Sequence, residues 1–300
     1  MGWRTAVFTE PCHLAIERGN LSYRPKNGEA LSLPLEDICA IVIETQQATL
    51  TAPLLDSLAQ QGGALFVCDK THTPSGVFLP FHQHSRYAKT ARSQIKWSAP
   101  FKKRVWQSLI KQKILNQAAL LAHYGSANAQ RLKNLADKVQ SGDTDNKEAQ
   151  AATIYWQTLF KNFSRSAIDI RNSALNYGYS IVRGAIARSV VSAGLIPAFG
   201  VHHSNELNAF NLVDDLIEPF RPIVDLLAIE LIGVEPRKDR IELNKNERFK
   251  LSGVLGRYVR MRGNKIMALS AADDAAFSLV RATTTNDWNE LDLPEPIFGD

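Results

Sequence analysis

Residues 202–222 read HHSNELNAFNLVDDLIEPFRP, and this stretch interrupts the helical pattern of the surrounding chain twice. Two asparagines supply turn chemistry after the histidine pair, and Pro219 biases the residue before it away from helical geometry. On one unbroken helix, His203 and Glu218 would lie about 22 Å apart, too far to share an ion. Because the helix is broken, the chain can fold the imidazole back over a helix that starts near Asn211.

Each polar residue in this stretch also has an ordinary structural interpretation. His203 can be a loop histidine, and Glu218 can cap the helix that Pro219 begins. Asp214 and Asp215 lie on the helix between them. Asp215 is one turn from Glu218 and could be a second ligand, a supporting group or part of a solvated face. The residue types alone leave these alternatives open.

A second carboxylate lies upstream, where Glu148 opens the segment EAQAATIYWQTLF. Asp145 precedes it in the right place for a capping box, in which Glu148 would return to the N-cap amide. As the alternative, Glu148 sits at the edge of a packed helical wall, a position that suits a rigid ligand. Oxygen and nitrogen donors from Glu148, His203 and Glu218 would suit one hard divalent cation. A metal site in a basic protein points to chemistry on phosphate.

The formal net charge of +5 is unevenly distributed. Residues 1–95 hold eight basic and eight acidic residues, whereas residues 96–138 hold nine basic residues and one acidic residue. This basic block is a candidate phosphate-facing surface, with a solvated helical face as the alternative. Its basic members are Lys96, Lys102, Lys103, Arg104, Lys111, Lys113, Arg131, Lys133 and Lys138.

Composition narrows the functional class further. The 300 residues are 45% apolar and 22% charged, which allows one large or two ordinary domains. No apolar run reaches the roughly 18 residues needed to cross a bilayer, and no secretory signal is evident, so we expect a cytoplasmic protein without a membrane partner. The three cysteines lack CxxC spacing and are typical of reduced core thiols. Walker A, GxSxG, HExxH and strand-linked GxGxxG motifs are absent from the sequence.

The hydrophobic periodicity changes near residue 85 and divides the chain. Before it, short alternating segments and turn signals predict strands, two hairpins, one helix in APLLDSLAQQ, a strand in ALFVCD that is buried on both faces and a surface loop over 72–76. After it, a period near 3.6 predicts helices. They cover residues 85–94, 100–124, 128–139, 145–161, 169–193, 211–218, 219–232, 247–261 and 270–284, followed by an extended tail.

The expected fold therefore has two domains. Residues 1–84 form a small, mainly β N-terminal domain with one helix, and residues 85–300 form a larger all-α C-terminal domain for catalysis and DNA binding. The N-terminal domain has no net charge by count and exposed strand edges, which suits self-association.

At these motifs the chain resembles the CRISPR-associated integrase, the nuclease-like catalytic subunit of the complex that inserts new spacers into a CRISPR array. The matching segments are EAQAATIYW, DIRNSALNYGYSIVRGAIARSVVSAGLIPAFGVHH and NAFNLVDDLIEPFRPIVD. The resemblance covers most of the helical domain and, more weakly, the N-terminal one. The IEPFRP wording resembles the form that accompanies single-protein RNA-guided effector nucleases.

The resemblance implies a divalent metal held by the glutamate of the first motif, the histidine that ends the second and the acid before PFRP. By position these are Glu148, His203 and Glu218, with His203 preferred to His202 because its separation from Glu218 fits the family pattern. The cofactor implied is Mg²⁺ or Mn²⁺, and the imidazole favours Mn²⁺.

The implied reaction is a metal-dependent transesterification in antiviral defence. The 3′-hydroxyl of a spacer DNA attacks a phosphodiester at the border of a repeat, and water in place of the hydroxyl gives endonuclease activity. A non-catalytic DNA-binding scaffold and a stand-alone structure-specific nuclease are the alternatives.

Partners follow from the same resemblance. They are double-stranded DNA, both spacer fragment and repeat array, a second copy of the chain through the N-terminal domain, a small subunit of the adaptation complex, and the effector nuclease as a further candidate. Arg221 is expected either to contact phosphate or to pair with Asp215. Other candidate DNA contacts are Lys102, Lys103 and Arg104 in the basic block, and Arg257, Arg260 and Arg262 in GRYVRMRG, with a helical surface face as the alternative for the last three.

Overall fold

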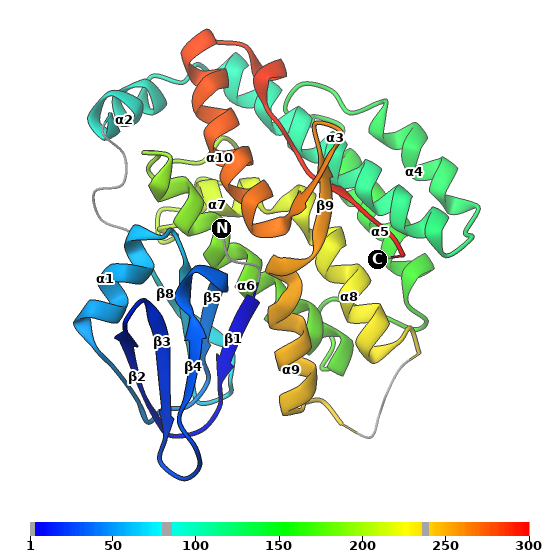
Figure 1. The fold of residues 1–300 in the computed structure, drawn as a ribbon. Coiled ribbons are helices and arrows are strands. Elements are labelled where there is room, and N and C mark those ends of the chain that lie inside the picture. Colours follow the sequence, from blue (N-terminus) through cyan, green and yellow to red (C-terminus); the bar gives the residue numbers. More distant parts are fainter. Residues whose placement is uncertain (1–3, 80–85, 236–239, 300) are drawn as a thin grey trace.

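The computed structural model describes residues 4–79, 86–235 and 240–299. Its N-terminal part is rich in strands and the rest is largely helical, which confirms the expected fold class (Figure 1). The predicted domain boundary between residues 84 and 85 lies outside the described residues, as does the start of the predicted helix 85–94. The described part of that helix is α2 (Tyr87–Ile95).

Two four-stranded sheets make up the N-terminal part. In the first sheet, of order β1-β5-β7-β8, the first three strands run parallel and the last runs antiparallel. Its strands are β1 (Arg4–Phe8), β5 (Ile38–Ile43), β7 (Ala64–Cys68) and β8 (Pro74–Phe78). The second sheet has the order β4-β3-β2-β6. Its strands are β2 (Cys12–Glu17), β3 (Asn20–Pro25), β4 (Leu31–Pro34) and β6 (Ala48–Leu50), and helix α1 (Ala52–Gln60) follows.

The two predicted hairpins are confirmed, because β2 pairs antiparallel with β3 and β3 with β4. The predicted loop over 72–76 is wrong from Pro74 onward, since Pro74–Phe78 forms β8 against β7. The turn between them is tighter than expected. Asp69 closes it by accepting hydrogen bonds from the backbone N–H groups of Thr71 and Thr73 at 2.8 and 3.0 Å.

Strand β5 lies between two hydrophobic cores and is buried along its whole length. Ile41 and Ile43 face the second sheet, whereas Ala40 and Val42 pack with the helices. Val67 of β7 is 42% exposed, so the expectation that ALFVCD is buried on both faces fails there. The cysteines are unbridged and buried, as expected: Cys12, Cys39 and Cys68.

The helices of the second part agree with the sequence pattern in number and place, with one exception. They are α3 (Ala99–His123), α4 (Asn128–Ala136), α5 (Lys147–Leu159), α6 (Ile170–Ser192), α7 (Asn211–Leu216), α8 (Arg221–Ile232), α9 (Lys245–Ser252) and α10 (Ala268–Thr285). Helix α6 runs through the middle of the molecule (Figure 1). No helix among the described residues is long and apolar enough to cross a membrane.

The exception is the predicted helix 247–261, which is wrong beyond residue 252. Helix α9 ends at Ser252, a 3₁₀ turn spans Gly253–Gly256, and the chain then enters strand β9 (Tyr258–Met261). Two glycines near the helix end, and alternating exposed and buried residues in YVRM, are the local cause. Strand β9 pairs with β10 (Asn264–Met267) and with β11 (Glu295–Pro296) in the C-terminal tail, so the helical part also carries a small sheet.

The contact between β7 and α6 depends on a glycine. A Cβ atom added to Gly184 would lie 2.2 Å from Cε1 of Phe66. We therefore expect Gly184→Ala to lower the free energy of unfolding by about 1–3 kcal/mol, because the aromatic ring must move out of a packed interface. Urea unfolding measures this effect. Gly253→Ala is the matched control, since a Cβ there meets nothing within 4 Å; equal stability of the two variants would contradict the prediction.

Candidate active site

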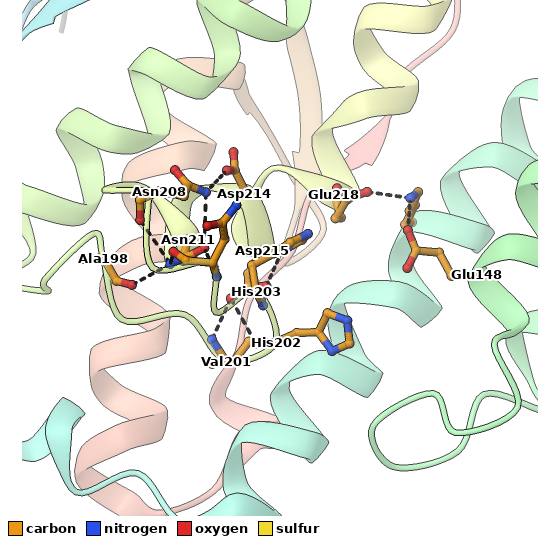
Figure 2. Close-up of polar contacts among 12 residues, drawn as sticks. Glu148, Ala198, Val201, His202, His203, Asn208, Asn211, Asp214, Asp215 and Glu218 are labelled. Atoms are coloured by element: carbon orange, nitrogen blue, oxygen red, sulfur yellow. Dashed lines mark hydrogen bonds and ion pairs between the residues drawn. The ribbon is translucent and has the colours of Figure 1, made fainter. Parts of the chain in front are cut away.

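Two of the predicted ligands meet around one lysine. The Nζ atom of Lys113, on α3, lies 2.5 Å from Oε1 of Glu148 on α5 and 2.5 Å from Oε2 of Glu218. The side chains of Lys113 and Glu218 are 10% and 6% exposed. An ammonium thus stands between two carboxylates that are distant in the sequence (Figure 2). Lys113 belongs to the basic block that was predicted as a surface, and that prediction is wrong for this residue.

Glu148 is available for this contact because other side chains cap α5. Asp143 accepts hydrogen bonds from the backbone N–H groups of Lys147 and Glu148 at 2.8 and 3.0 Å. The N-cap residue is Asn146, whose side chain accepts from Ala149 N. The capping-box alternative for Asp145 and Glu148 is therefore wrong, and the Glu148 carboxylate turns to Lys113.

Glu218 begins the 3₁₀ turn η2 (Glu218–Phe220) between α7 and α8, and its side chain does not cap a helix. Its Oε1 accepts from Nε of Arg221 at 2.9 Å, so Arg221 pairs with Glu218 and not with Asp215. Burial raises the pKa of Glu218, but Lys113 and Arg221 more than offset it and bring the pKa to about 2. The carboxylate is therefore ionised at neutral pH.

A second contact holds the turn that carries Glu218. The Nδ2 atom of Asn116, one turn after Lys113 on α3, donates to the carbonyl oxygen of Pro219 at 2.7 Å and to that of Pro294 at 2.8 Å. One buried amide thus ties the backbone next to Glu218 to α3 and to the C-terminal tail.

His203 is oriented by Asp215, whose side chain is fully buried. Oδ1 of Asp215 lies 2.7 Å from Nδ1 of His203 and accepts from the His203 N–H at 3.0 Å. Oδ2 accepts from the N–H of Val201 at 2.6 Å. The hydrogen bond to Asp215 raises the pKa of His203 above its ordinary value. Asp215 is therefore a residue that supports the histidine, one of the alternatives that the sequence left open.

Asp214 and His202, the sequence neighbours of Asp215 and His203, make contacts of their own. Asp214 accepts from Nε of Arg183 at 2.5 Å and from Nδ2 of Asn208 at 2.7 Å. Asp215 is fully buried, so the solvated-face alternative is wrong for it. The ring of His202 stacks on Trp106 with centroids 4.0 Å apart, whereas His203 meets Trp106 edge-on at 5.8 Å. The backbone N–H of His202 also donates to Oδ2 of Asp215 at 3.2 Å, but it is the imidazole of His203 that contacts this carboxylate.

His203 does not join the other two ligands in a ready metal site. It lies in the same region in Figure 2, and the charge of Glu218 contributes to the raised pKa of His203. However, it is not among the residues that line the cavity around Glu148 and Glu218. In the parts of the chain that the structure describes, no group of three or more His, Cys, Asp and Glu side chains is arranged to hold a metal. The ligand assignment stays a prediction.

The pair of glutamates nevertheless fits a cation. Oε2 of Glu218 is buried and has no hydrogen-bond partner, although Lys113 Nζ lies within ion-pair distance. Two carboxylates facing one another at low exposure require a positive charge between them, which the lysine supplies here. Hard oxygen donors of this kind suit Mg²⁺ and Mn²⁺.

The other candidate DNA contacts are spread over the surface. Arg104 lies over the ring of Trp288, with 5.2 Å from Cζ to the ring centroid, while Lys102 and Lys103 precede it on α3. Arg257 pairs with Glu230 at 2.6 Å. Arg262 pairs with Asp292, and Arg260 is exposed on β9. DNA binding by these residues stays a prediction.

A buried acid that the sequence analysis did not single out lies beside this cavity. Asp225, on α8, is 1% exposed and accepts hydrogen bonds from the hydroxyls of Tyr155, at 2.6 Å, and Tyr179. Burial raises its pKa to about 6, against the effect of the two hydroxyls and of nearby arginines. A pattern signal existed, since Asp225 follows Arg221 by one helical turn.

This raised pKa has a consequence for stability. Because the folded protein binds the proton of Asp225 more tightly than the unfolded chain, the carboxyl contributes stability at low pH that is lost as pH rises through about 6. Asp225→Asn removes the titration. We expect wild type to lose about 2 kcal/mol relative to this variant between pH 4 and pH 7. Urea unfolding of both proteins at several pH values measures it, and a pH-independent difference would show that Asp225 does not titrate in this way.

Comparison with known proteins identifies the family. The family model described as CRISPR associated protein Cas1 matches residues 5–252. The CRISPR-associated endonuclease Cas1 of Neisseria meningitidis serogroup C (strain 8013) is 40% identical over 297 residues, covering 98% of this chain and 97% of the relative. A solved casposase bound to integration product has a TM-score of 0.72 at 17% identity, covering 95% of this chain and 93% of that chain.

A chain of a Cas6-RT-Cas1–Cas2 complex has a TM-score of 0.70 at 19% identity, covering 98% of this chain and 36% of that chain. The two structural likenesses show a shared fold. The family match and the relative from Neisseria extend over most of the chain, and on these grounds the protein belongs to the Cas1 family of CRISPR-associated proteins.

Proposed function

We propose that this protein is a metal-dependent DNA integrase and endonuclease of CRISPR adaptation, which joins the 3′-hydroxyls of spacer DNA to repeat phosphodiesters. The observation that carries the proposal is the meeting of Glu148 and Glu218 around one cationic position. The name of the relative, an endonuclease, and the integration product in the casposase structure support the same reaction class.

The proposed ligands of Mg²⁺ or Mn²⁺ are Glu148, His203 and Glu218. When bound, the ion would lower the cost of charge on the attacking oxygen, the phosphate and the leaving oxygen. Other side chains of the protein orient the proposed ligands. Arg221 fixes one oxygen of Glu218, and Asp215 engages Nδ1 of His203, which leaves Nε2 of the imidazole for another partner.

The proposed partners are double-stranded DNA and a small subunit of the adaptation complex. The integration product in one similar structure and the Cas2 subunit in another support them. A second copy of the chain and the effector nuclease remain expectations from the sequence.

Replacing Lys113 tests whether the glutamates hold a metal. In EDTA, Lys113→Met should lower the free energy of unfolding by about 3 kcal/mol, because it leaves the buried Glu218 and the partly exposed Glu148 without the ammonium between them. Mn²⁺ should then raise the melting temperature of this variant more than that of wild type. Lys111→Met is the control, since Lys111 is 48% exposed and forms a surface ion pair with Asp137. If Mn²⁺ stabilises Lys113→Met no more than Lys111→Met, the carboxylates are not a metal site.

Strand transfer tests the reaction. The purified protein, its small partner subunit, Mn²⁺, a labelled duplex and a repeat-bearing plasmid should give a joined product. We expect Glu148→Gln, Glu218→Gln and His203→Ala each to reduce joining at least about 100-fold, because each removes a group that stabilises charge in the transition state.

The control for this experiment is His202→Asn, which changes the neighbouring histidine and should retain joining. Wild-type levels of joining by Glu148→Gln or His203→Ala would overturn the site assignment. A duplex with 3′-dideoxy ends separates the alternatives, because an integrase gives a joined product only with a 3′-hydroxyl, whereas a stand-alone nuclease cuts the plasmid equally with either duplex and joins neither.

A further inference from the structure

The cavity beside Glu148 and Glu218 reaches a third cation, Arg165. The cavity has a volume of about 250 Å³, and the rings of Trp156 and Tyr179 also line it. Arg165 lies between α5 and α6, in a segment that none of the sequence motifs covers. Its guanidinium therefore shares one space with the proposed ligands although it comes from a loop.

Two asparagines hold this guanidinium in place. Nη1 of Arg165 donates to Oδ1 of Asn172, and Nη2 donates to Oδ1 of Asn176 at 2.8 Å. The Asn172 amide cannot turn around, because its Nδ2 donates to the carbonyl oxygens of Ser164 and Ala167, each at 2.8 Å. Its oxygen must therefore face Arg165.

Aromatic faces complete the support. Cζ of Arg165 lies 5.8 Å from the ring centroid of Trp156 and 5.6 Å from that of Tyr179. Cation–π contacts of this kind restrain a guanidinium without removing its charge.

Within the described residues, no carboxylate forms an ion pair with Arg165. The other two cations of the cavity are engaged: Lys113 by both glutamates and Arg221 by Glu218. Asp225 lines the same cavity, but tyrosine hydroxyls occupy its two oxygens. Neutral acceptors thus fix the position of Arg165 and leave its positive charge available.

The geometry points to Arg165 as the residue that binds a backbone phosphate of the DNA end in this cavity, next to the reacting bond. This inference rests on the proposed function and adds a substrate contact to it. The two asparagines use two of the five N–H donors of a guanidinium, so three remain for phosphate oxygens. A planar guanidinium with several donors is well suited to a phosphate.

The first experiment measures binding of a labelled duplex with a single-stranded 3′ end by fluorescence anisotropy over a range of salt concentrations. Arg165→Gln should weaken binding about tenfold to 100-fold. It should also reduce the magnitude of the slope of log K against log salt by about 0.7, the value for one phosphate contact on a single strand. Arg165→Lys should restore part of the affinity, because it keeps the charge and loses the planar fork.

Arg24→Gln serves as the matched control, since it removes the same charge from an exposed position on β3 in the second N-terminal sheet. If Arg165→Gln folds and binds the duplex with the affinity and salt slope of Arg24→Gln, Arg165 has only a structural role and the inference is overturned.

Asn176→Asp distinguishes the effect of the charge of Arg165 on DNA binding from its structural role, and it leaves Arg165 in place. Asn176 is exposed, and an aspartate there would keep the hydrogen bond and add the missing counter-ion. The variant should be at least as stable as wild type but should bind the DNA end less tightly. Unchanged affinity in a stabilised Asn176→Asp variant would indicate that Arg165 only braces the loop.

Strand transfer by the same preparations distinguishes this inference from the proposed function. Wild type that binds the duplex but never joins it would refute the integrase proposal and would leave the affinity comparison intact. Normal joining with equal DNA affinity in wild type and Arg165→Gln would refute the inference alone. Mn²⁺-induced thermal stabilisation should be the same in wild type and Arg165→Gln, because Arg165 does not contact the glutamates.

Discussion

An ammonium between two carboxylates is the interaction on which this site depends. Glu148 and Glu218 come from separate helical segments and approach one another at a partly buried point, where two negative charges would repel strongly in the absence of a cation. Lys113 of α3 supplies that cation. The fold of the helical part thus already contains the electrostatic condition that a divalent ion would satisfy.

The surrounding polar groups hold each proposed ligand from outside. Asp143 accepts hydrogen bonds from the first N–H groups of α5, and Arg221 donates to one oxygen of Glu218. Asp215 holds the histidine loop through hydrogen bonds to both of its carboxylate oxygens. Because each of these contacts is made within the chain, the ligand side chains are oriented before any substrate enters. Such prior orientation is what catalysis of charge development requires, since reorganisation during the reaction costs rate.

The sequence predicted the helices well because their apolar residues recur with a period near 3.6 over long segments. It failed at 247–261, where a short polar helix, a glycine turn and a strand follow one another too closely for periodicity to separate them. Glu148 and Glu218 were predicted from motifs and they do meet. The role of Lys113 was missed because a count of charges treats every lysine as exposed, although Lys113 falls in the buried stripe of α3 with Leu109 and Ile110. Arg165 gave no signal, since its position depends on asparagines that only the fold brings near.

The buried amide of Asn116 joins two segments that are distant in the sequence, because one nitrogen donates to the carbonyl oxygen of Pro219, beside Glu218, and to that of Pro294, just before β11. The C-terminal tail therefore helps to hold the turn that carries Glu218. Anything that pulls this tail aside, such as a fusion partner or a binding protein that captures it, would release one of the restraints on the turn that presents the carboxylate.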